Sequence, residues 1–166
     1  MKKIAAFLFL IAIISCSNSS KEKTSFDKKA LTETLLTLNG KQVSFESILK
    51  ENEGKTTVIE VWASWCGDCI GAMPQLKELQ ATHPDANYVF ISMDKSTKAW
   101  EKGIEKHEIK GSHYMANDQM KGKFAKAIDL DWIPRYIIID KTGKIVLYRA
   151  IEKDFDLINK IITELK

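Results

Sequence analysis

Two cysteines separated by two residues, Cys66 and Cys69, are the side chains whose types and spacing favour chemistry. The apolar pattern that follows them predicts a helix from about Cys66 to Thr82. Cysteines three positions apart in the first turn of a helix project from the same side, within reach of a disulfide bond. We therefore predict that the pair switches between dithiol and disulfide, a two-electron exchange that requires no cofactor.

The two cysteines are expected to differ in reactivity. Cys66 lies at the predicted helix start, where unpaired backbone N–H groups and the helix dipole favour a thiolate and lower its pKa below the free value of about 8.5. Cys69 lies one turn inside the helix, where we expect it to be less exposed. We predict that Cys66 is the attacking nucleophile and that Cys69 resolves the mixed disulfide formed with a substrate.

A Cys-x-x-Cys pair also occurs in zinc and haem sites. Structural zinc needs four ligands, and this sequence has no second pair and no ligand spacing among His83, His107 and His113. Covalent haem attachment needs a histidine directly after the second cysteine, where this chain has Ile70. The sequence therefore predicts no metal ligand set of either kind.

The elements predicted around the cysteines alternate between strands and helices. Strands are predicted over Leu35–Leu38, Gln42–Phe45, Thr56–Ala63, Tyr88–Met93, His113–Met115, Tyr136–Asp140 and Lys144–Ala150. Helical segments are predicted over Ser47–Lys50, Cys66–Thr82, Thr97–His107, Gln119–Ile128 and Asp154–Lys166. The alternation is typical of a parallel sheet, and the turns at Gly40 and Gly143 indicate antiparallel hairpins. We expect an α/β fold with a mixed central sheet and an N-terminal hairpin extension.

The segment Glu60–Cys69 reads EVWASWCGDC, with Pro74 five residues later and Ile133-Pro134 near the other end of the chain. These motifs resemble the thioredoxin superfamily, and within it the TlpA/ResA-like extracytoplasmic thiol–disulfide oxidoreductases. The resemblance covers nearly all of residues 31–166 and implies a thioredoxin-like three-layer α/β/α sandwich. It also implies an enzyme that reduces protein disulfides, receives electrons from an upstream membrane thiol donor, and serves processes such as cytochrome c maturation.

The same resemblance implies a substrate-binding surface. Pro134 would be a cis-proline facing the dithiol, although from the residues alone we expect a trans bond, because only about 5–6% of X–Pro bonds are cis. With a cis bond, the backbone of Ile133 would pair with an extended substrate segment by strand addition. Trp65, directly before Cys66, is a candidate contact at the rim of this surface.

Glu60 interrupts an otherwise apolar run predicted to be a strand buried on both faces. An unpaired carboxylate is costly in such a place, and desolvation is expected to raise its pKa. By the resemblance, Glu60 stands where thioredoxins keep a buried acid beneath the active site. We interpret Glu60 as the acceptor of the Cys69 proton during resolution, acting through water; the alternative is a structural acid at the end of the sheet.

Three residues near the cysteines are candidates for tuning the redox equilibrium. Asp68 replaces the proline common in cytoplasmic thioredoxins, and its charge disfavours the Cys66 thiolate. Arg135 follows Pro134 where threonine is usual, and would offset Asp68 if it lies close. Neither Gly67 nor Asp68 resembles the histidine of strongly oxidising relatives, whose reduced state is stabilised. The sequence therefore favours a reductase over an oxidase.

The N-terminal segment predicts export and a lipid anchor. A basic start is followed by a short apolar run over residues 4–14, which is typical of a secretory signal. The following Ser15-Cys16 resembles a bacterial lipobox, which implies a signal peptide over residues 1–15 and a lipid on Cys16. Residues 16–30 are polar and predict a flexible tether. We expect the protein on the periplasmic side of a bacterial membrane, held there by its lipid.

Composition restricts the remaining possibilities. A chain of 166 residues suits one domain, which we place at residues 31–166 and expect to be a monomer. The net charge is only +3 and the lysines are scattered, so we expect no nucleic-acid partner. Lipidation of Cys16 would leave Cys66 and Cys69 as the thiols of the mature chain, and one pair is not a structural disulfide framework.

An alternative function uses the same cysteines. Soft thiolates suit Cu(I), so the pair could belong to a metallochaperone-like module, although the sequence shows no evident third ligand. A peroxide-reducing enzyme is disfavoured, because the Pro-x-x-x-Thr-x-x-Cys pattern of such proteins is missing.

Overall fold

The computed structural model describes residues 23–166 and shows one seven-stranded mixed sheet, in the order β2-β1-β5-β4-β3-β6-β7. The strands are β1 (Thr34–Thr37), β2 (Gln42–Ser44), β3 (Thr57–Trp62), β4 (Asn87–Ser92), β5 (Ser112–Ala116), β6 (Arg135–Ile139) and β7 (Ile145–Ala150). The three central strands β5, β4 and β3 are parallel, and the pairs on either side of them are antiparallel. The predicted mixed sheet is confirmed.

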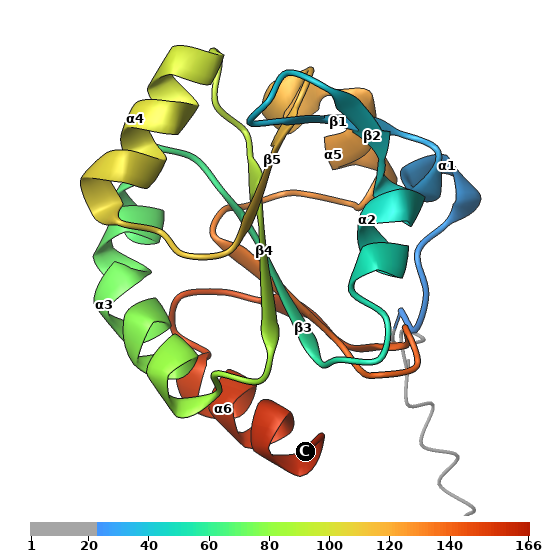
Figure 1. Cartoon of the computed structure of the whole chain (residues 1–166), viewed down its shortest axis with the longest axis vertical. Helices are drawn as coiled ribbons and strands as arrows, with labels where there is room; N and C mark the ends of the chain where they lie inside the picture. Colours follow the sequence, from blue (N-terminus) through green and yellow to red (C-terminus); the bar gives the residue numbers. More distant parts are fainter. Residues whose placement is uncertain (1–22) are drawn as a thin grey trace, which may run out of the picture.

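Helices cover both faces of this sheet. They are α1 (Lys28–Leu31), α2 (Phe45–Glu51), α3 (Gly67–Thr82), α4 (Thr97–His107), the 3-10 turn η1 (Gln119–Lys121), α5 (Lys123–Ala127) and α6 (Phe155–Glu164). Figure 1 shows α3, α4 and α6 on one face and α1, α2 and α5 on the other, which confirms the three-layer sandwich. Among the described helices, none has the length and apolar character needed to cross a membrane.

Strand β3 lies inside the sheet, between β4 and β6, and leads directly into the cysteine pair. All six of its residues are buried, as predicted for a strand covered on both faces. It pairs in parallel with β4 and antiparallel with β6. Because β6 begins where β3 ends, Arg135 lies opposite Val61, and the segments around Cys66 and Pro134 meet at the same edge of the sheet.

The predicted N-terminal hairpin forms β1 and β2, with Gly40 at φ +79° in the turn, a conformation that glycine adopts without strain. The hairpin extends the sheet because β1 also pairs with β5. The helical turn predicted at Ser47–Lys50 is the longer helix α2, which begins at Phe45 because the Ser44 hydroxyl accepts a hydrogen bond from the backbone N–H of Ser47.

The ordered domain begins earlier than predicted, so the tether assignment is wrong for residues 23–30. Phe26 is buried with its ring edge-on to Phe45, at a centroid separation of 4.8 Å, and Ala30 in α1 is fully buried. The carbonyl of Thr24 accepts a hydrogen bond of 2.9 Å from the backbone N–H of Ile145. The signal peptide at 1–15, Cys16 and tether residues 16–22 lie outside the described residues.

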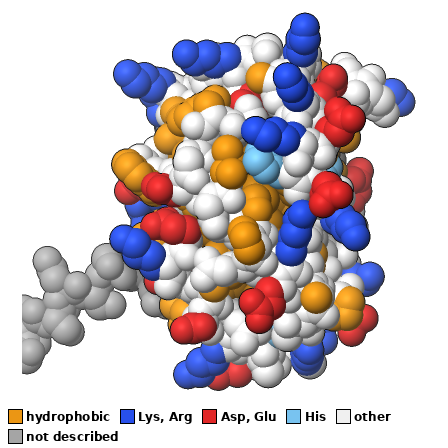
Figure 2. Space-filling model, turned by 90° about the vertical axis from the view of Figure 1, so that its left-hand side faces the viewer, with side chains coloured by type: hydrophobic (Ala, Val, Ile, Leu, Met, Phe, Trp, Pro, Cys, Tyr) orange, Lys and Arg blue, Asp and Glu red, His pale blue; other side chains and the backbone are white. Residues whose placement is uncertain are grey.

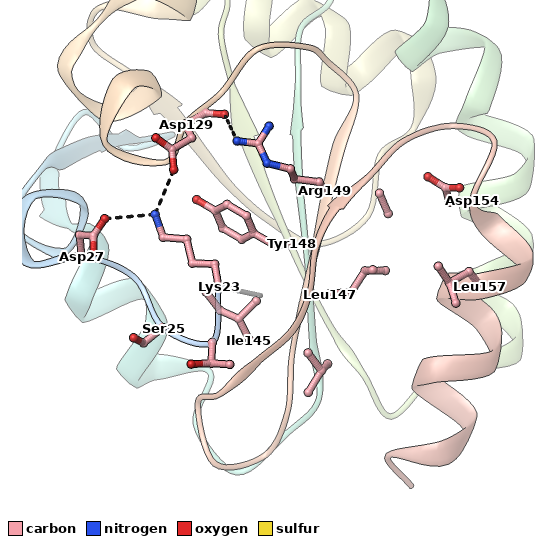
Figure 3. A pocket seen from close by; sticks show the side chains of 13 residues that line it. Lys23, Ser25, Asp27, Asp129, Ile145, Leu147, Tyr148, Arg149, Asp154 and Leu157 are labelled. Atoms are coloured by element: carbon pink, nitrogen blue, oxygen red, sulfur yellow. Dashed lines mark hydrogen bonds and ion pairs between the residues drawn. The ribbon is translucent and has the colours of Figure 1, made fainter. Parts of the chain in front are cut away.

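A shallow depression lies between this N-terminal segment, β7 and α6 (Figure 3). Lys23 forms ion pairs there with Asp27 at 3.1 Å and with Asp129 at 3.3 Å, and its ammonium lies 5.1 Å from the ring centroid of Tyr148. Arg149 donates to the carbonyl of Asp129 at 3.3 Å. The contacts of Lys23 hold the start of the domain against Asp129 and against Tyr148 of the edge strand β7.

The helix predicted over Gln119–Ile128 is divided in two. Gly122 is extended, with φ −75° and ψ −177°, and separates η1 from α5. The carboxylate of Asp118 accepts a hydrogen bond from the backbone N–H of Lys123 at the start of α5. The Asp118 carboxylate therefore pairs with a backbone N–H at the N-terminus of α5, where the sequence predicted one continuous helix.

Candidate active site

Cys66 and Cys69 form a disulfide, with their Cα atoms 5.3 Å apart. Cys66 is the N-cap residue of α3, which begins at Gly67, one residue later than predicted. The Cys66 sulfur accepts a hydrogen bond from the backbone N–H of Cys69 at 3.1 Å. The predicted proximity of the two cysteines at a helix start is therefore confirmed.

The surroundings of Cys66 favour attack by this cysteine. A backbone N–H and the positive end of the α3 dipole both stabilise negative charge on its sulfur in the reduced state. Cys66 is 6% exposed, whereas Cys69 is fully buried. The sulfur nearer to solvent is also the one at the electropositive helix end, which suits a nucleophile, and Cys69 suits a resolving thiol.

The loop before β6 lies against the disulfide. The Ile133–Pro134 bond is cis, as the family resemblance implies, so the trans bond expected from the residues alone is wrong. The carbonyl oxygen of Ile133 lies 3.5 Å from the Cys66 sulfur. The structure therefore brings together the four predicted positions Cys66, Cys69, Ile133 and Pro134.

Glu60 lies in β3 on the side of the sheet that α3 and α6 cover. It is 1% exposed and stands directly opposite Tyr136 of β6. Tyr136 packs edge-on against Phe155 of α6, at a centroid separation of 5.2 Å, which fixes the face on which both side chains lie. As predicted, burial raises the pKa of Glu60, to about 8, and the Tyr136 phenol opposes this rise.

Tyr136 is a titratable neighbour of Glu60 that the sequence did not identify. It is fully buried, and burial together with the negative charges of Glu60 and Glu152 raises its pKa. Neither carboxyl oxygen of Glu60 nor the Tyr136 hydroxyl has a hydrogen bond of standard geometry within the described residues. The sequence signal was a polar aromatic two residues after Pro134, but its relation to Glu60 depends on the pairing of β3 with β6.

Arg135 does not pair with Asp68. It is 2% exposed, lies opposite Val61, and forms an ion pair with Asp131, which also accepts from Arg149 at 2.9 Å. Burial lowers the pKa of the Arg135 guanidinium. Asp68 is exposed, and it lines one depression together with Asp131, Trp132, Arg135, Arg149, Ile151, Glu152 and Lys153. Arg135, which was expected to offset the charge of Asp68, therefore pairs with Asp131 instead.

Two exposed tryptophans adjoin the active-site segments in sequence. Trp65, which was predicted, is 55% exposed and directly precedes Cys66. Trp132, which was not assigned a role, is 56% exposed and directly precedes Ile133. On the face of the molecule that α3 and α4 cover, basic and acidic side chains are interspersed around apolar surface (Figure 2). The exposed aromatic rings are apolar surface on the two segments that adjoin the disulfide.

Comparison with known proteins agrees with this geometry. The Redoxin family matches residues 22–156. Thiol–disulfide oxidoreductase ResA of Bacillus cereus is 25% identical over 130 residues, which cover 77% of this chain and 71% of the relative. YkuV of Bacillus subtilis, also a thiol–disulfide oxidoreductase, is 29% identical over 119 residues, covering 68% of this chain and 76% of the relative.

Solved structures of other proteins share this fold. A candidate thiol–disulfide oxidoreductase from Bacteroides vulgatus is 34% identical, with a TM-score of 0.66, covering 82% of this chain and 88% of that one. A candidate interchange protein, DsbE of Chlorobium tepidum, has a TM-score of 0.69 at 21% identity, covers 87% of this chain and 99% of its own, and shows the shared fold. The chain belongs to the Redoxin family, as a TlpA/ResA-like thiol–disulfide oxidoreductase of the thioredoxin superfamily.

Proposed function

We propose that this protein reduces disulfides of other proteins outside the cytoplasm, with Cys66 as the nucleophile and Cys69 as the resolving thiol. The observation that carries the proposal is the position of the Cys66 sulfur. It lies at the N-terminus of α3, 3.1 Å from the backbone nitrogen of Cys69 and 3.5 Å from the carbonyl oxygen of Ile133. A thiolate is stabilised there, next to a loop that can align a substrate backbone.

The reaction proceeds in two exchanges. The Cys66 thiolate attacks one sulfur of the substrate disulfide, and the other substrate sulfur leaves as a thiolate. Glu60 then accepts the proton of the Cys69 thiol, through water, and the Cys69 thiolate attacks the Cys66 sulfur. The second substrate thiolate leaves, two electrons have passed to the substrate, and the Cys66–Cys69 disulfide of this structure has formed.

Restoration of the dithiol requires an electron donor, which we place in the membrane as a thiol protein. The direction of flow depends on how well the active site stabilises the Cys66 thiolate. No histidine lies between the two cysteines, and the exposed Asp68 carboxylate opposes negative charge on Cys66. A less stabilised reduced state gives a more negative reduction potential, which favours a reductase.

Substrate recognition is assigned to Trp65, Ile133 and Pro134, with Trp132 added from the structure. A substrate segment in extended conformation would pair with the backbone of Ile133 beside Cys66. The exposed rings of Trp65 and Trp132 would bury apolar side chains of that segment. Because most of the recognition is through the main chain, the enzyme is expected to accept several substrates.

The proposed location is the surface of a bacterial membrane. Cleavage before Cys16 and lipidation of its sulfur would anchor the mature chain as a monomer on the periplasmic side of a bacterial membrane. Only residues 17–22 then separate the lipid from the domain, since residues from Lys23 onward are packed. An extended chain spans at most about 3.6 Å for each residue, so the domain would stay within about 25 Å of its anchor.

The proposal is tested by equilibrating a soluble form that lacks residues 1–16, and therefore Cys16, with glutathione or dithiothreitol buffers and measuring the thiol fraction. A reduction potential near about −270 mV supports a reductase, whereas a value near about −120 mV identifies an oxidant. If the pair forms no disulfide in these buffers but binds Cu(I) stoichiometrically, the copper-binding alternative replaces the redox function. Cys66→Ser is the control that removes both activities.

A further inference from the structure

The buried position of Glu60 raises the question of how its proton reaches solvent. The side chain is 1% exposed, and both carboxyl oxygens are buried without a hydrogen bond of standard geometry among residues 23–166. With a pKa raised to about 8, Glu60 holds a proton in most molecules at pH 7. It must release that proton before it can accept one from Cys69. A base in this position therefore needs a second group that connects it to water.

Tyr136 is in the position to make that connection. It is the register partner of Glu60 across the β3–β6 pair, so the two side chains lie side by side on the same face. Its hydroxyl is buried and, among the residues described, has no hydrogen bond of standard geometry. Each of the two groups alters the pKa of the other. The ring is held by its contact with Phe155.

Glu152 completes a path from the core to the surface. It lies in the loop between β7 and α6, is partly exposed, and has one buried carboxyl oxygen without a hydrogen bond in the described part of the chain. Its charge raises the pKa of Tyr136. Glu152 also lines the depression shared with Asp68 and Trp132. Tyr136 pairs with Glu60 on one side and with Ala150, two residues before Glu152, on the other side. Glu60 is buried, whereas Glu152 is partly exposed.

Charged groups near Glu152 line the same depression, namely Asp68, Arg149 and Lys153, whereas the elements packed against Tyr136 bring no further charge to it. Arg135, the neighbour of Tyr136 in β6, projects to the opposite face and is paired with Asp131. On β4, the register partner of Glu60 is Phe90, which carries no charge. From α6, Phe155 provides an apolar contact with Tyr136. The carboxylates whose charges act on Tyr136 are therefore Glu60 and Glu152.

We propose that the Tyr136 hydroxyl carries protons between Glu60 and the solvent-facing Glu152, which rests on the proposed role of Glu60 in the resolution step. Tyr136 gives its hydroxyl proton to Glu152 while it takes the proton of Glu60. One proton moves outward, no electrons move, and the phenol is neutral before and after. The two transfers occur together, because burial beside two carboxylates disfavours a phenolate. Glu152 then releases the proton to water.

The test follows the two exchanges separately by stopped flow. The reduced soluble form that lacks residues 1–16 is mixed with an aromatic disulfide whose released thiolate absorbs visible light. The first release reports attack by Cys66, and the second reports resolution by Cys69. In Tyr136→Phe, which keeps the ring against Phe155, we expect the second phase to slow by about tenfold or more, with its pH midpoint displaced upward and the first phase unchanged.

Further variants separate proton transfer from packing. Glu152→Gln is expected to slow the second phase, and Glu152→Asp to restore most of the rate. Tyr88→Phe is the matched control, because its hydroxyl is also buried but donates to the carbonyls of Leu79 and His83, each at 3.2 Å. If Tyr136→Phe fails to fold, the two Glu152 variants decide the question.

The outcomes distinguish this inference from the function on which it rests. An unchanged second phase and pH profile in Tyr136→Phe overturn the proton path, as does equal slowing of both phases. If the wild-type chain shows neither phase, the proposed function itself fails. A second phase that slows in Tyr136→Phe and Glu152→Gln, but not in Tyr88→Phe, supports the path.

Discussion

The Cys66 sulfur lies 3.5 Å from the carbonyl oxygen of Ile133, although 67 positions separate the two residues in the chain. The antiparallel pairing of β3 and β6 produces this proximity, because the residues that follow β3 meet those that precede β6. The proposed nucleophile and the proposed substrate-binding segment are therefore held at one edge of the sheet.

The first prediction concerns the order of attack. In Cys69→Ser, we expect a stable mixed disulfide between Cys66 and a protein substrate, because the resolving thiol is missing. In Cys66→Ser, we expect no such adduct, since Cys69 is fully buried. Non-reducing electrophoresis and mass spectrometry of the captured species check this result. Adducts of equal yield in the two variants would show that the assigned roles are wrong.

The second prediction concerns stability against pH. The pKa of Glu60 is raised from 4.5 to about 8 on folding, so between these values the folded state binds more protons than the unfolded state. Stability from this group is therefore present at low pH and falls as the pH rises through that window, by about 1.4 kcal/mol for each pH unit at most. Glu60→Gln should flatten this dependence.

Urea unfolding of the wild type and Glu60→Gln at several pH values between about 4.5 and 8 measures this difference. Asp94→Asn is not a suitable control, because Asp94 accepts hydrogen bonds from Ser64 and Ser92. Asp156→Asn, at an exposed position in the first turn of α6, changes one carboxylate without disturbing the core. Parallel pH curves for wild type and Glu60→Gln would contradict the buried protonated acid.

The third prediction concerns redox tuning by Asp68. Removing its charge in Asp68→Asn should stabilise the Cys66 thiolate, lower the pKa of that thiol, and make the reduction potential less negative. Because Asp68 is exposed, the change should be small, about 10–20 mV. Glutathione titration of both proteins at low salt checks the sign. A more negative potential in the variant would exclude an electrostatic action of Asp68 on Cys66.

The fourth prediction concerns the two exposed tryptophans. Trp65→Ala and Trp132→Ala should each raise the KM for a protein disulfide by about tenfold, through loss of apolar contact, and leave the rate with a small disulfide unchanged. Leu157→Ala is the matched control, since Leu157 is also exposed, at 44%, but lies on α6. Equal KM values for the wild type and all three variants would show that the tryptophans do not contact the substrate.

The fifth prediction concerns the anchor. Expressed with its native N-terminus in a bacterium, the wild type should fractionate with membranes and incorporate labelled fatty acid, whereas Cys16→Ser should do neither. The thiol–disulfide activity of the Cys16→Ser protein should be unchanged, because Cys66 and Cys69 form their own pair. Membrane association that persists in Cys16→Ser would show that another segment holds the protein.

Local patterns in the sequence were enough to predict β3, α3 and the cysteine pair, since these depend on apolar runs and on helix geometry. The relation of Glu60 to Tyr136 was not predictable in this way, because it depends on which strands pair and in which register. The domain start was also missed. Phe26 is a single aromatic in a polar segment, and its burial becomes apparent only when Phe45 and Tyr148 are placed around it.

The hydrogen bond between Thr24 and Ile145 determines where the chain enters the domain. Ile145 pairs with Ile139, at the end of β6 remote from Pro134. Entry and disulfide therefore lie at opposite ends of that strand, whose five residues span about 14 Å. With a lipid on Cys16, the disulfide would lie at the end of the domain away from its point of attachment. A donor in the same membrane would then have to extend along the domain to reach Cys66.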